Sequence, residues 1–556
     1  MTNRDVSGTT FEYRFRDPKM TPEARGGTLP EYRSSLEDGM LIERDVVVTT
    51  RTGVEIFIDV FRPNNDEPAA PLVAWMPYGK HNPLPIQKIF PNAGVRPEWT
   101  SSHTAFECPD PVYWVQHGYA VILVDLPGTW NSGGSATYCS PEEAEAFYDL
   151  IEWAGTQPWS NGKVGLSGVS YLTVAQWRVA ELEPPHLAAI NPYEGWTDTY
   201  REVVRHGGIP STSFWPYLSQ RWGASRTQIE DLERETAEHP FFDAFWQSKS
   251  AELEKIRVPA YVVASWSDQG LHTRGTLEGF SRISSSEKWL EVHGGKKWAH
   301  YYEPESVERQ RAFFDRYLKG IDNDVLNWPP VRLDVRQSSG VGKYRTAGEW
   351  PPAETDYQKL YLDASRGSLD WTLPPQEASA SYDGAGSGPG AHRAEFEFTF
   401  DRPMDLVGHM KATLYVSAEA PDMDLFVAVW KINAAGDAVT FPYYGNFENG
   451  AVALGWLRAS HRELDENRSS DYLPVLAHQR LLEMENGAPT RVDIEILPSG
   501  TSFQPGDRLR FVVQGTDVHK FPRKEVFARH EDTVNEGVHV IHTGGRFDSH
   551  LLVPVL

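Results

Sequence analysis

The strongest chemical signal in the sequence is a serine between a buried strand and a helix. Residues 163–169 are mostly apolar and contain two glycines, and an apolar, helix-forming stretch begins at Tyr171. Hydrolases place a nucleophilic serine at such a turn, because its hydroxyl then projects above the strand end and the next backbone N–H faces the developing oxyanion. Ser167 and Ser170 both fit this segment. We favour Ser170, since Gly168 precedes it by two positions and a helix can begin directly after it.

A nucleophilic serine also needs a histidine base and a carboxylate that orients the base. In sheets of this type the three follow in the order serine, acid, histidine, each beyond a later strand. Asp268 follows an apolar segment and is the candidate acid. We expect His300 to be the base, since it lies in the loop after the next predicted strand, 289–292. His293 abuts that strand and is more typical of a structural group, and His272 is the remaining alternative.

The oxyanion needs a second hydrogen-bond donor, and Tyr78 is a candidate. It follows the predicted strand 71–76, where its hydroxyl could face the nucleophile, although a packed aromatic ring at a strand end is the other interpretation. Two His-Gly-Gly segments, at 206–208 and 293–295, resemble an esterase signature that belongs upstream of the nucleophile. Both follow Ser170, so we exclude them from the oxyanion site.

The elements that must position these residues form an alternating pattern of strands and helices. Segments 41–50 and 54–62 predict an antiparallel hairpin, and 71–76 and 119–126 are apolar enough for strands buried on both faces. Ser140 with Glu143 predicts a capping box at the start of a helix. Further strands are expected at 163–169, 187–190 and 260–265, and further helices at 171–182 and 306–318. Strands that alternate with helices predict an α/β sheet with crossover connections.

The pattern of predicted strands, helices and aromatic residues divides the chain into four regions. We expect an N-terminal arm over 1–40, an α/β-hydrolase domain over 41–192 and 257–325, and a helical cap inserted at 193–256, where aromatic residues gather. Residues 326–556 contain short strands separated by turn-rich loops, such as 383–391, and predict a β jelly roll.

Composition excludes several classes of function. The chain has 53 Lys and Arg against 77 Asp and Glu, a net charge of −24, which disfavours nucleic acid binding. No apolar run approaches the roughly 18–20 residues of a membrane span, and no signal-peptide pattern opens the chain, so we expect a cytoplasmic protein without a membrane partner. Two cysteines and no HExxH motif or Cys/His cluster give no basis for a metal or another cofactor.

Several ordered motifs resemble the CocE/NonD hydrolases, relatives of cocaine esterase, X-Pro dipeptidyl-peptidases and α-amino-acid ester hydrolases. The resemblance runs from about residue 41 to the end of the chain. It rests on DVFRP at 59–63, MPYGK at 76–80, DLPG at 125–128, SGG at 132–134, GVSYL at 168–172, DMD at 422–424 and FDSHLLVPVL at 547–556. Pro127 stands where the family usually has arginine and Thr173 where it has glycine, which suggests altered packing near the pocket.

The resemblance implies a role for individual residues. Ser170 would be the nucleophile, Asp268 the acid and His300 the base, with the Tyr78 hydroxyl and the Tyr171 N–H as oxyanion donors. The family binds acyl groups with aromatic residues of the cap and of the segment beside the acid. The candidates here are Trp196, Phe214, Trp215 and Trp266, although core packing is the commoner fate of such side chains.

The sequence thus predicts an α/β hydrolase with an inserted cap and a C-terminal jelly roll, acting as a serine hydrolase on a carboxylic ester. The partner would be a small-molecule ester or amide, and the sequence is compatible with a homo-oligomer. Three alternatives stay open: an amide or peptide hydrolase, a lactone hydrolase, and a catalytically inactive relative that binds a ligand.

Overall fold

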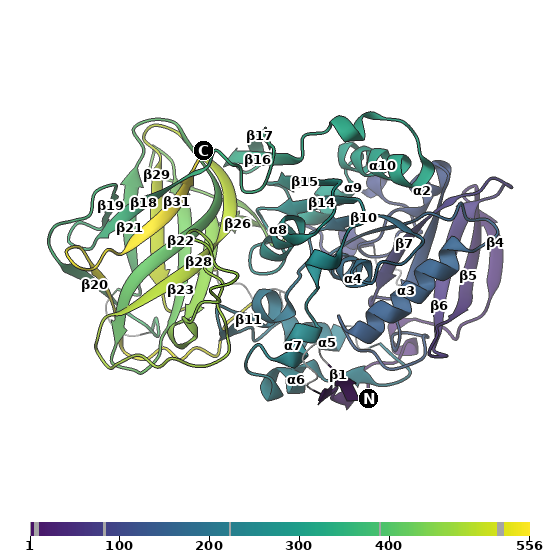
Figure 1. Ribbon diagram of the computed structural model, residues 1–556, viewed down its shortest axis with the longest axis horizontal. Coiled ribbons are helices and arrows are strands. Elements are labelled where there is room, and N and C mark those ends of the chain that lie inside the picture. The colour runs from purple at the N-terminus through teal and green to yellow at the C-terminus, as the bar shows by residue number, and fades with distance from the viewer. Residues whose placement is uncertain (1, 5–9, 82–84, 222–223, 388–390, 520–527) are drawn as a thin grey trace.

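A long, mostly parallel sheet forms the centre of the α/β-hydrolase part, which lies beside a C-terminal part built of strands (Figure 1). The computed structural model describes residues 2–4, 10–81, 85–221, 224–387, 391–519 and 528–556. Neighbouring strands from β8 to β16 run parallel. The sheet order is β4 (Arg33–Glu37), β5 (Met40–Thr49), β6 (Glu55–Pro63), β8 (Tyr119–Asp125), β7 (Ala70–Met76), β9 (Val164–Val169), β10 (Leu187–Tyr193), β14 (Ala260–Ser265), β15 (Lys288–His293) and β16 (Val331–Ser338).

The predicted hairpin and the apolar strands are confirmed. β5 and β6 pair antiparallel, and every residue of β7, β8, β9 and β14 is buried, as expected of strands covered on both faces. The carboxyl ends of these parallel strands lie at one edge of the sheet, so the loops that follow β7, β9 and β14 meet there.

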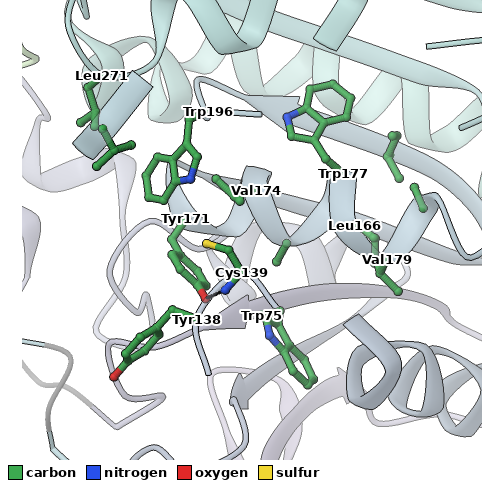
Figure 2. Packing of buried hydrophobic residues seen from close by; sticks show 14 of the residues in the cluster. Trp75, Tyr138, Cys139, Leu166, Tyr171, Val174, Trp177, Val179, Trp196 and Leu271 are labelled. Carbon is green, nitrogen blue, oxygen red and sulfur yellow. Dashed lines mark hydrogen bonds between the residues drawn. The ribbon is translucent and has the colours of Figure 1, made fainter. Parts of the chain in front are cut away.

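Helices cover both faces of this sheet (Figure 1): α1 (Ile86–Ile89), α2 (Pro111–Gln116), α3 (Pro141–Gly155), α4 (Tyr171–Ala180), α8 (Thr273–Arg282), α9 (Lys297–Tyr302) and α10 (Pro304–Lys319). The predicted cap of α3 forms, since Ser140 Oγ accepts the Glu143 N–H at 3.0 Å. α10 ends at Gly320, whose φ of +68° is the left-handed conformation expected at a helix end. α4 packs on the sheet through a continuous set of buried side chains, including Trp177 and Val174 (Figure 2).

Residues between β10 and β14 form short elements over one end of the sheet. They comprise a π-helical turn (Tyr200–Val204), α5 (Phe214–Arg221), α6 (Leu232–Glu238), α7 (Ala244–Ser248) and the two-residue strands β11 (Arg205–His206), β12 (Ile209–Pro210) and β13 (Ile229–Glu230). β13 pairs with β3 (Phe15–Arg16), so the N-terminal arm lies on this insertion. Earlier in the arm, β1 (Thr2–Arg4) pairs with β2 (Thr10–Glu12).

The C-terminal part has its own apolar core. One of the two further cores extends from the hydrolase part into it, since that core includes Val407, Ala428 and Val512. Its predicted loop 383–391 falls partly outside the described residues. One pair, Arg336 with Thr501, joins its strands to β16 of the hydrolase sheet. The strands from the end of that sheet onward are β17 (Val341–Ala347), β18 (Asp356–Asp363), β19 (Ser368–Asp370), β20 (Ala378–Asp383), β21 (Arg393–Thr399), β22 (Met404–Ala418), β23 (Asp424–Ile432), β24 (Ala438–Val439), β25 (Phe441–Tyr443), β26 (Phe447–Gly450), β27 (Ala453–Arg458), β28 (Thr490–Phe503), β29 (Arg508–Gln514), β30 (Val538–Thr543) and β31 (His550–Val555).

In the part of the chain that the structure describes, no helix combines the length and the apolar character needed to cross a bilayer.

Candidate active site

Ser170 occupies the sharp turn between β9 and α4. Its backbone has φ +63° and ψ −117°, a strained conformation for a residue with a side chain, costing of the order of 1–3 kcal/mol. Gly168 makes the turn compatible with the helix, because a Cβ there would lie 2.3 Å from Leu172 Cδ2. Ser167 instead lies within β9, where its hydroxyl bonds to the Tyr301 hydroxyl at 2.9 Å. The turn therefore presents Ser170 and not Ser167.

Thr173 fits the first turn of α4 because a glycine lies opposite. Its hydroxyl donates to the Tyr193 carbonyl at 2.9 Å or to that of Gly168 at 3.1 Å, and accepts from the Tyr193 N–H at 2.7 Å. A Cβ at Gly195 would lie 2.5 Å from Thr173 Cβ. A glycine at position 173 would leave room for a side chain on the facing loop. Here the loop carries a glycine instead, Gly195, which leaves room for Thr173.

The imidazole that reaches Ser170 belongs to His272. Ser170 Oγ lies 3.2 Å from His272 Nε2, and His272 Nδ1 bonds to Asp268 Oδ2 on its other side. A carboxylate oxygen accepts hydrogen bonds, so a ring nitrogen bonded to it must carry a proton. Nδ1 of His272 is therefore protonated, and Nε2 presents a lone pair to the serine. Trp196 stacks on the imidazole with 5.7 Å between ring centroids and 10° between planes, which holds the ring's orientation.

The prediction that His300 is the residue against Ser170 is wrong. His300 lies on α9, where its Nδ1 accepts the Tyr193 hydroxyl and its ring stacks on His293 at 3.7 Å. Its Nε2 faces the Glu291 and Glu303 carboxyl groups at 3.7 and 3.5 Å. Both ring nitrogens are therefore engaged away from the nucleophile.

His293, the other candidate after that strand, binds Glu194 through Nε2 at 2.8 Å. The residue after β15 that contacts the acid is instead Lys297, whose Nζ donates to Asp268 Oδ2 at 2.7 Å.

A sequence signal for His272 was available but weak. Asp268 and His272 are four residues apart at the point where the loop after β14 turns into α8. That turn is helical, since the His272 N–H donates to the Asp268 carbonyl at 3.0 Å. Residues four apart in such a turn share a face, so one loop can supply both acid and base. The order of motifs along the chain favoured the later histidine instead.

Burial and the lysine set the charges of this group. Burial lowers the pKa of His272, and the Lys297 ammonium lowers it further, to about 4 despite the opposing Asp268 carboxylate. Burial alone would raise the pKa of Asp268, but Lys297 and His272 hold it well below its usual range. The imidazole is thus neutral and the carboxylate charged at neutral pH, the protonation states required of a base and the group that orients it.

The segment after β7 carries Tyr78 into the same pocket as Ser170. Gly79 follows with φ +97°, and a Cβ there would lie 2.2 Å from the Trp130 ring. The Lys80 N–H donates to Asp125 Oδ1 at 2.8 Å, which anchors the segment to the end of β8. Tyr78 thus lies just beyond the strand end and lines the pocket of Ser170, while the donation of its hydroxyl to the oxyanion stays a prediction.

Tyr171 is the first residue of α4, so its backbone N–H belongs to the helix turn whose donors have no intrahelical acceptor. Its side chain turns away from the pocket into the core, where its hydroxyl donates to Glu143 Oε2 at 2.6 Å and receives the Cys139 N–H at 3.1 Å (Figure 2). The backbone of Tyr171 can therefore serve the site and its ring cannot.

The pocket at Ser170 is partly open to solvent and is lined largely by aromatic side chains. Of the four predicted aromatic residues, Phe214 lines it. Trp196 packs behind His272, Trp266 donates to the Asp334 carbonyl at 2.7 Å in the interior, and Trp215 is almost fully buried. Sequence reasoning missed the remaining aromatic lining: Phe90, Phe106, Tyr217, Trp298, Tyr444 and Phe447.

Two of those residues, Tyr444 and Phe447, come from the C-terminal part, so both halves of the chain build the pocket. Glu107 adds a buried carboxyl group. Its Oε1 accepts the Trp298 indole N–H at 2.9 Å, and burial raises its pKa to about 7. The pocket thus combines an apolar wall with one acid that titrates near neutral pH.

One group of side chains in the described residues brings metal-ligating atoms within 4.8 Å of one another: Asp45, Asp59 and His81. The Lys80 ammonium already lies among them, bonded to Asp45 and 2.9 Å from Asp59 Oδ1. Asp59 also pairs with Arg44 at 2.9 Å. These cations compensate the carboxylates, so the group functions as an ion-pair cluster that supports the Tyr78 segment and does not suit a metal.

Comparisons with known proteins agree with this architecture. A family model described as X-Pro dipeptidyl-peptidase (S15 family) matches residues 52–302, and one for the X-Pro dipeptidyl-peptidase C-terminal non-catalytic domain matches 323–552. Cocaine esterase of Rhodococcus sp. (strain MB1 Bresler) is 25% identical over 616 residues, covering 93% of this chain and 98% of that protein. An α-amino acid ester hydrolase of known structure is 17% identical with a TM-score of 0.70, covers 97% of this chain and 100% of its own, and shares the fold.

A crystal structure of a CocE/NonD family hydrolase from Staphylococcus aureus superposes with a TM-score of 0.91 at 41% sequence identity. The superposition covers 97% of this chain and 99% of that one. The chain therefore belongs to the CocE/NonD family of hydrolases.

Proposed function

We propose that the protein is a serine hydrolase that cleaves a carboxylic ester through an acyl-enzyme on Ser170, with His272 as base and Asp268 as the acid that orients it. The observation that carries the proposal is the contact of Ser170 Oγ with His272 Nε2 at 3.2 Å while Nδ1 bonds to Asp268. This is the relation of nucleophile, base and carboxylate that acyl transfer requires.

Each step of the proposed reaction is assigned to one residue of the site. As Ser170 attacks the carbonyl carbon, its proton passes to His272 Nε2, and the imidazolium is stabilised by Asp268. The Tyr78 hydroxyl and the Tyr171 N–H donate to the tetrahedral oxyanion, where loss of one donor typically costs about 3–4 kcal/mol. The imidazolium then protonates the leaving alkoxide. Water, deprotonated by His272, attacks the acyl-enzyme carbonyl. The imidazolium then returns this proton to Ser170 Oγ as the Oγ–acyl bond breaks and the acid leaves.

The wall of the pocket supports an ester with a hydrocarbon or aromatic group. Phe106, Phe214 and Trp298 are among its aromatic residues, and small-molecule sites with such walls bind apolar groups and orient them with few polar contacts. The similarity to cocaine esterase favours an ester over an amide. A lactone or an amide of the same shape would meet the same groups.

Labelling with a fluorophosphonate tests the proposal directly. The native protein should take up one equivalent at Ser170, and Ser170→Ala should take up none. A panel of aryl esters, alkyl esters, lactones and p-nitroanilides then identifies the bond. Absence of labelling in the folded native protein would favour an inactive relative, and faster p-nitroanilide turnover would favour an amidase.

A further inference from the structure

A histidine base was expected after β15, but the residue there that contacts Asp268 is a buried lysine. Lys297 is the first residue of α9, and its side chain is 3% exposed. Its Nζ lies 2.7 Å from Asp268 Oδ2 and 3.2 Å from His272 Nδ1. The ammonium and the imidazole thus share one carboxylate oxygen.

We propose that Lys297 is a positioning residue for the hydrolytic site, whose ammonium fixes the Asp268 carboxylate and through it the ring and tautomer of His272. This inference rests on the proposed function and adds a residue to it.

The Asp268 carboxylate has few other partners. Asp268 is fully buried, and its Oδ1 accepts no hydrogen bond from the residues that the structure describes. Among the described residues, the side-chain donors to the carboxylate are His272 and Lys297, and both bond to Oδ2. A buried carboxylate with a single neutral partner is costly and takes up a proton readily. Lys297 supplies the positive charge that keeps it ionised.

Lys297 also affects which nitrogen of His272 carries the proton. The ammonium has donors only, so its contact with Nδ1 cannot be a hydrogen bond while Nδ1 carries a proton. That proton lies on Nδ1 because Oδ2 accepts it, and Oδ2 remains charged because Lys297 also donates to it. The lone pair of Nε2 consequently stays directed at Ser170.

Lys297 can act as a fixed charge because carboxyl groups surround it. Asp268, Glu107 and Glu194 raise its pKa above the usual value although burial lowers it. Lys297 from α9 and Ser170 from the nucleophile turn contact the pair of Asp268 and His272. The other titratable groups that interact electrostatically with Asp268 are Glu194, directly after β10, Glu107 from the pocket wall, and Tyr443 and Tyr444 from the C-terminal part. Lys297 is the cation among these groups.

The test is the pH dependence of kcat/KM for an aryl ester in Lys297→Met, Lys297→Arg and the native protein. Loss of a positive charge within about 4 Å lets the pair of Asp268 and His272 take up its proton at higher pH. The acidic limb in Lys297→Met should therefore move up by about 1–3 pH units. Lys297→Arg keeps the charge and should leave the limb within about half a unit, well below the shift expected for the neutral variant.

Lys296→Met is the matched control, because Lys296 is the neighbouring residue and bonds instead to the Asn92 carbonyl at 2.7 Å and to Glu448. Its profile should match that of the native protein. If Lys297→Met does not fold by circular dichroism, Lys297→Gln replaces it under the same criteria.

An unmoved limb in the neutral variant, or equal shifts in the neutral and Arg variants, would overturn the inference. A purely structural role would lower kcat/KM at every pH and leave the limb in place. Failure of the proposed function is recognised separately, by lack of fluorophosphonate labelling at Ser170 in the native protein.

Discussion

Replacing His272 and His300 in separate variants distinguishes the base that the structure indicates, His272, from the one that motif order favours, His300. We compare His272→Gln with His300→Gln. Glutamine keeps a polar side chain of similar reach, so in the first variant its amide can still donate to Asp268, and Lys297 still compensates that charge. Both variants should fold, which thermal unfolding checks.

The expected losses differ because only one ring touches the nucleophile. His272 Nε2 lies 3.2 Å from Ser170 Oγ, and removal of a general base typically costs 10²–10⁴-fold in rate, about 3–5 kcal/mol of transition-state stabilisation. His300 contacts Tyr193 and stacks on His293. Its loss removes one buried hydrogen bond, about 1 kcal/mol, so we expect kcat/KM within about fivefold of the native value.

The assay is steady-state hydrolysis of an aryl ester, with fluorophosphonate labelling rates as a measure of nucleophile activation that does not require turnover. His272→Gln should be slow in both measurements and His300→Gln close to native in both. The opposite pattern, a large loss in folded His300→Gln with native rates in His272→Gln, would refute the assignment and restore the later histidine.

Three further predictions follow from the site. Tyr78→Phe should lower kcat about tenfold or more with little change in Tm, because it removes one oxyanion donor, and an unchanged kcat would remove Tyr78 from the site. Since the pKa of His272 is lowered to about 4, the limb of the native kcat/KM profile that reports the base should fall as the pH drops through about 4, whereas a midpoint near 6.5 for that limb would contradict the lowered value. Gly195→Ala should destabilise the protein by about 1–3 kcal/mol in urea unfolding, because its Cβ would lie 2.5 Å from Thr173 Cβ. Additional Thr173→Gly removes that Cβ and should recover part of the loss, and additive losses would count against the packing argument.

Most of the fold was accessible from the sequence because its signals are local. Continuous apolar segments give strands buried on both faces, and the predicted β14 coincides with 260–265. The cap of α3 at Ser140 and the end of α10 at Gly320 follow from backbone chemistry within a few residues. The bounds of the short elements in the inserted region, such as α6 at Leu232–Glu238, were not accessible in the same way, because the ends of short helices are weakly determined by local sequence.

In the candidate site, residue types and strand order were sufficient to predict the residues whose positions depend on local backbone geometry. Ser170 is determined by a glycine two positions before it and a helix directly after it, and Asp268 by the end of a buried strand. Tyr78 follows another strand end at the same edge of the sheet. For these three positions the chain direction alone determines where the side chain emerges.

The choice of base depended on tertiary structure, because three histidines lie within reach of the same edge and their order along the chain does not say where each ring points. His272 meets Ser170 because α8 begins inside the acid loop and Trp196 supports the ring, while α9 carries His300 to Tyr193 and gives Lys297 to Asp268. The aromatic wall was likewise decided by packing, since Phe106 and Phe447 are far apart in sequence and meet only when the two halves of the chain come together. Local patterns set the backbone path, whereas side-chain partners across elements are set by burial and charge in the assembled fold.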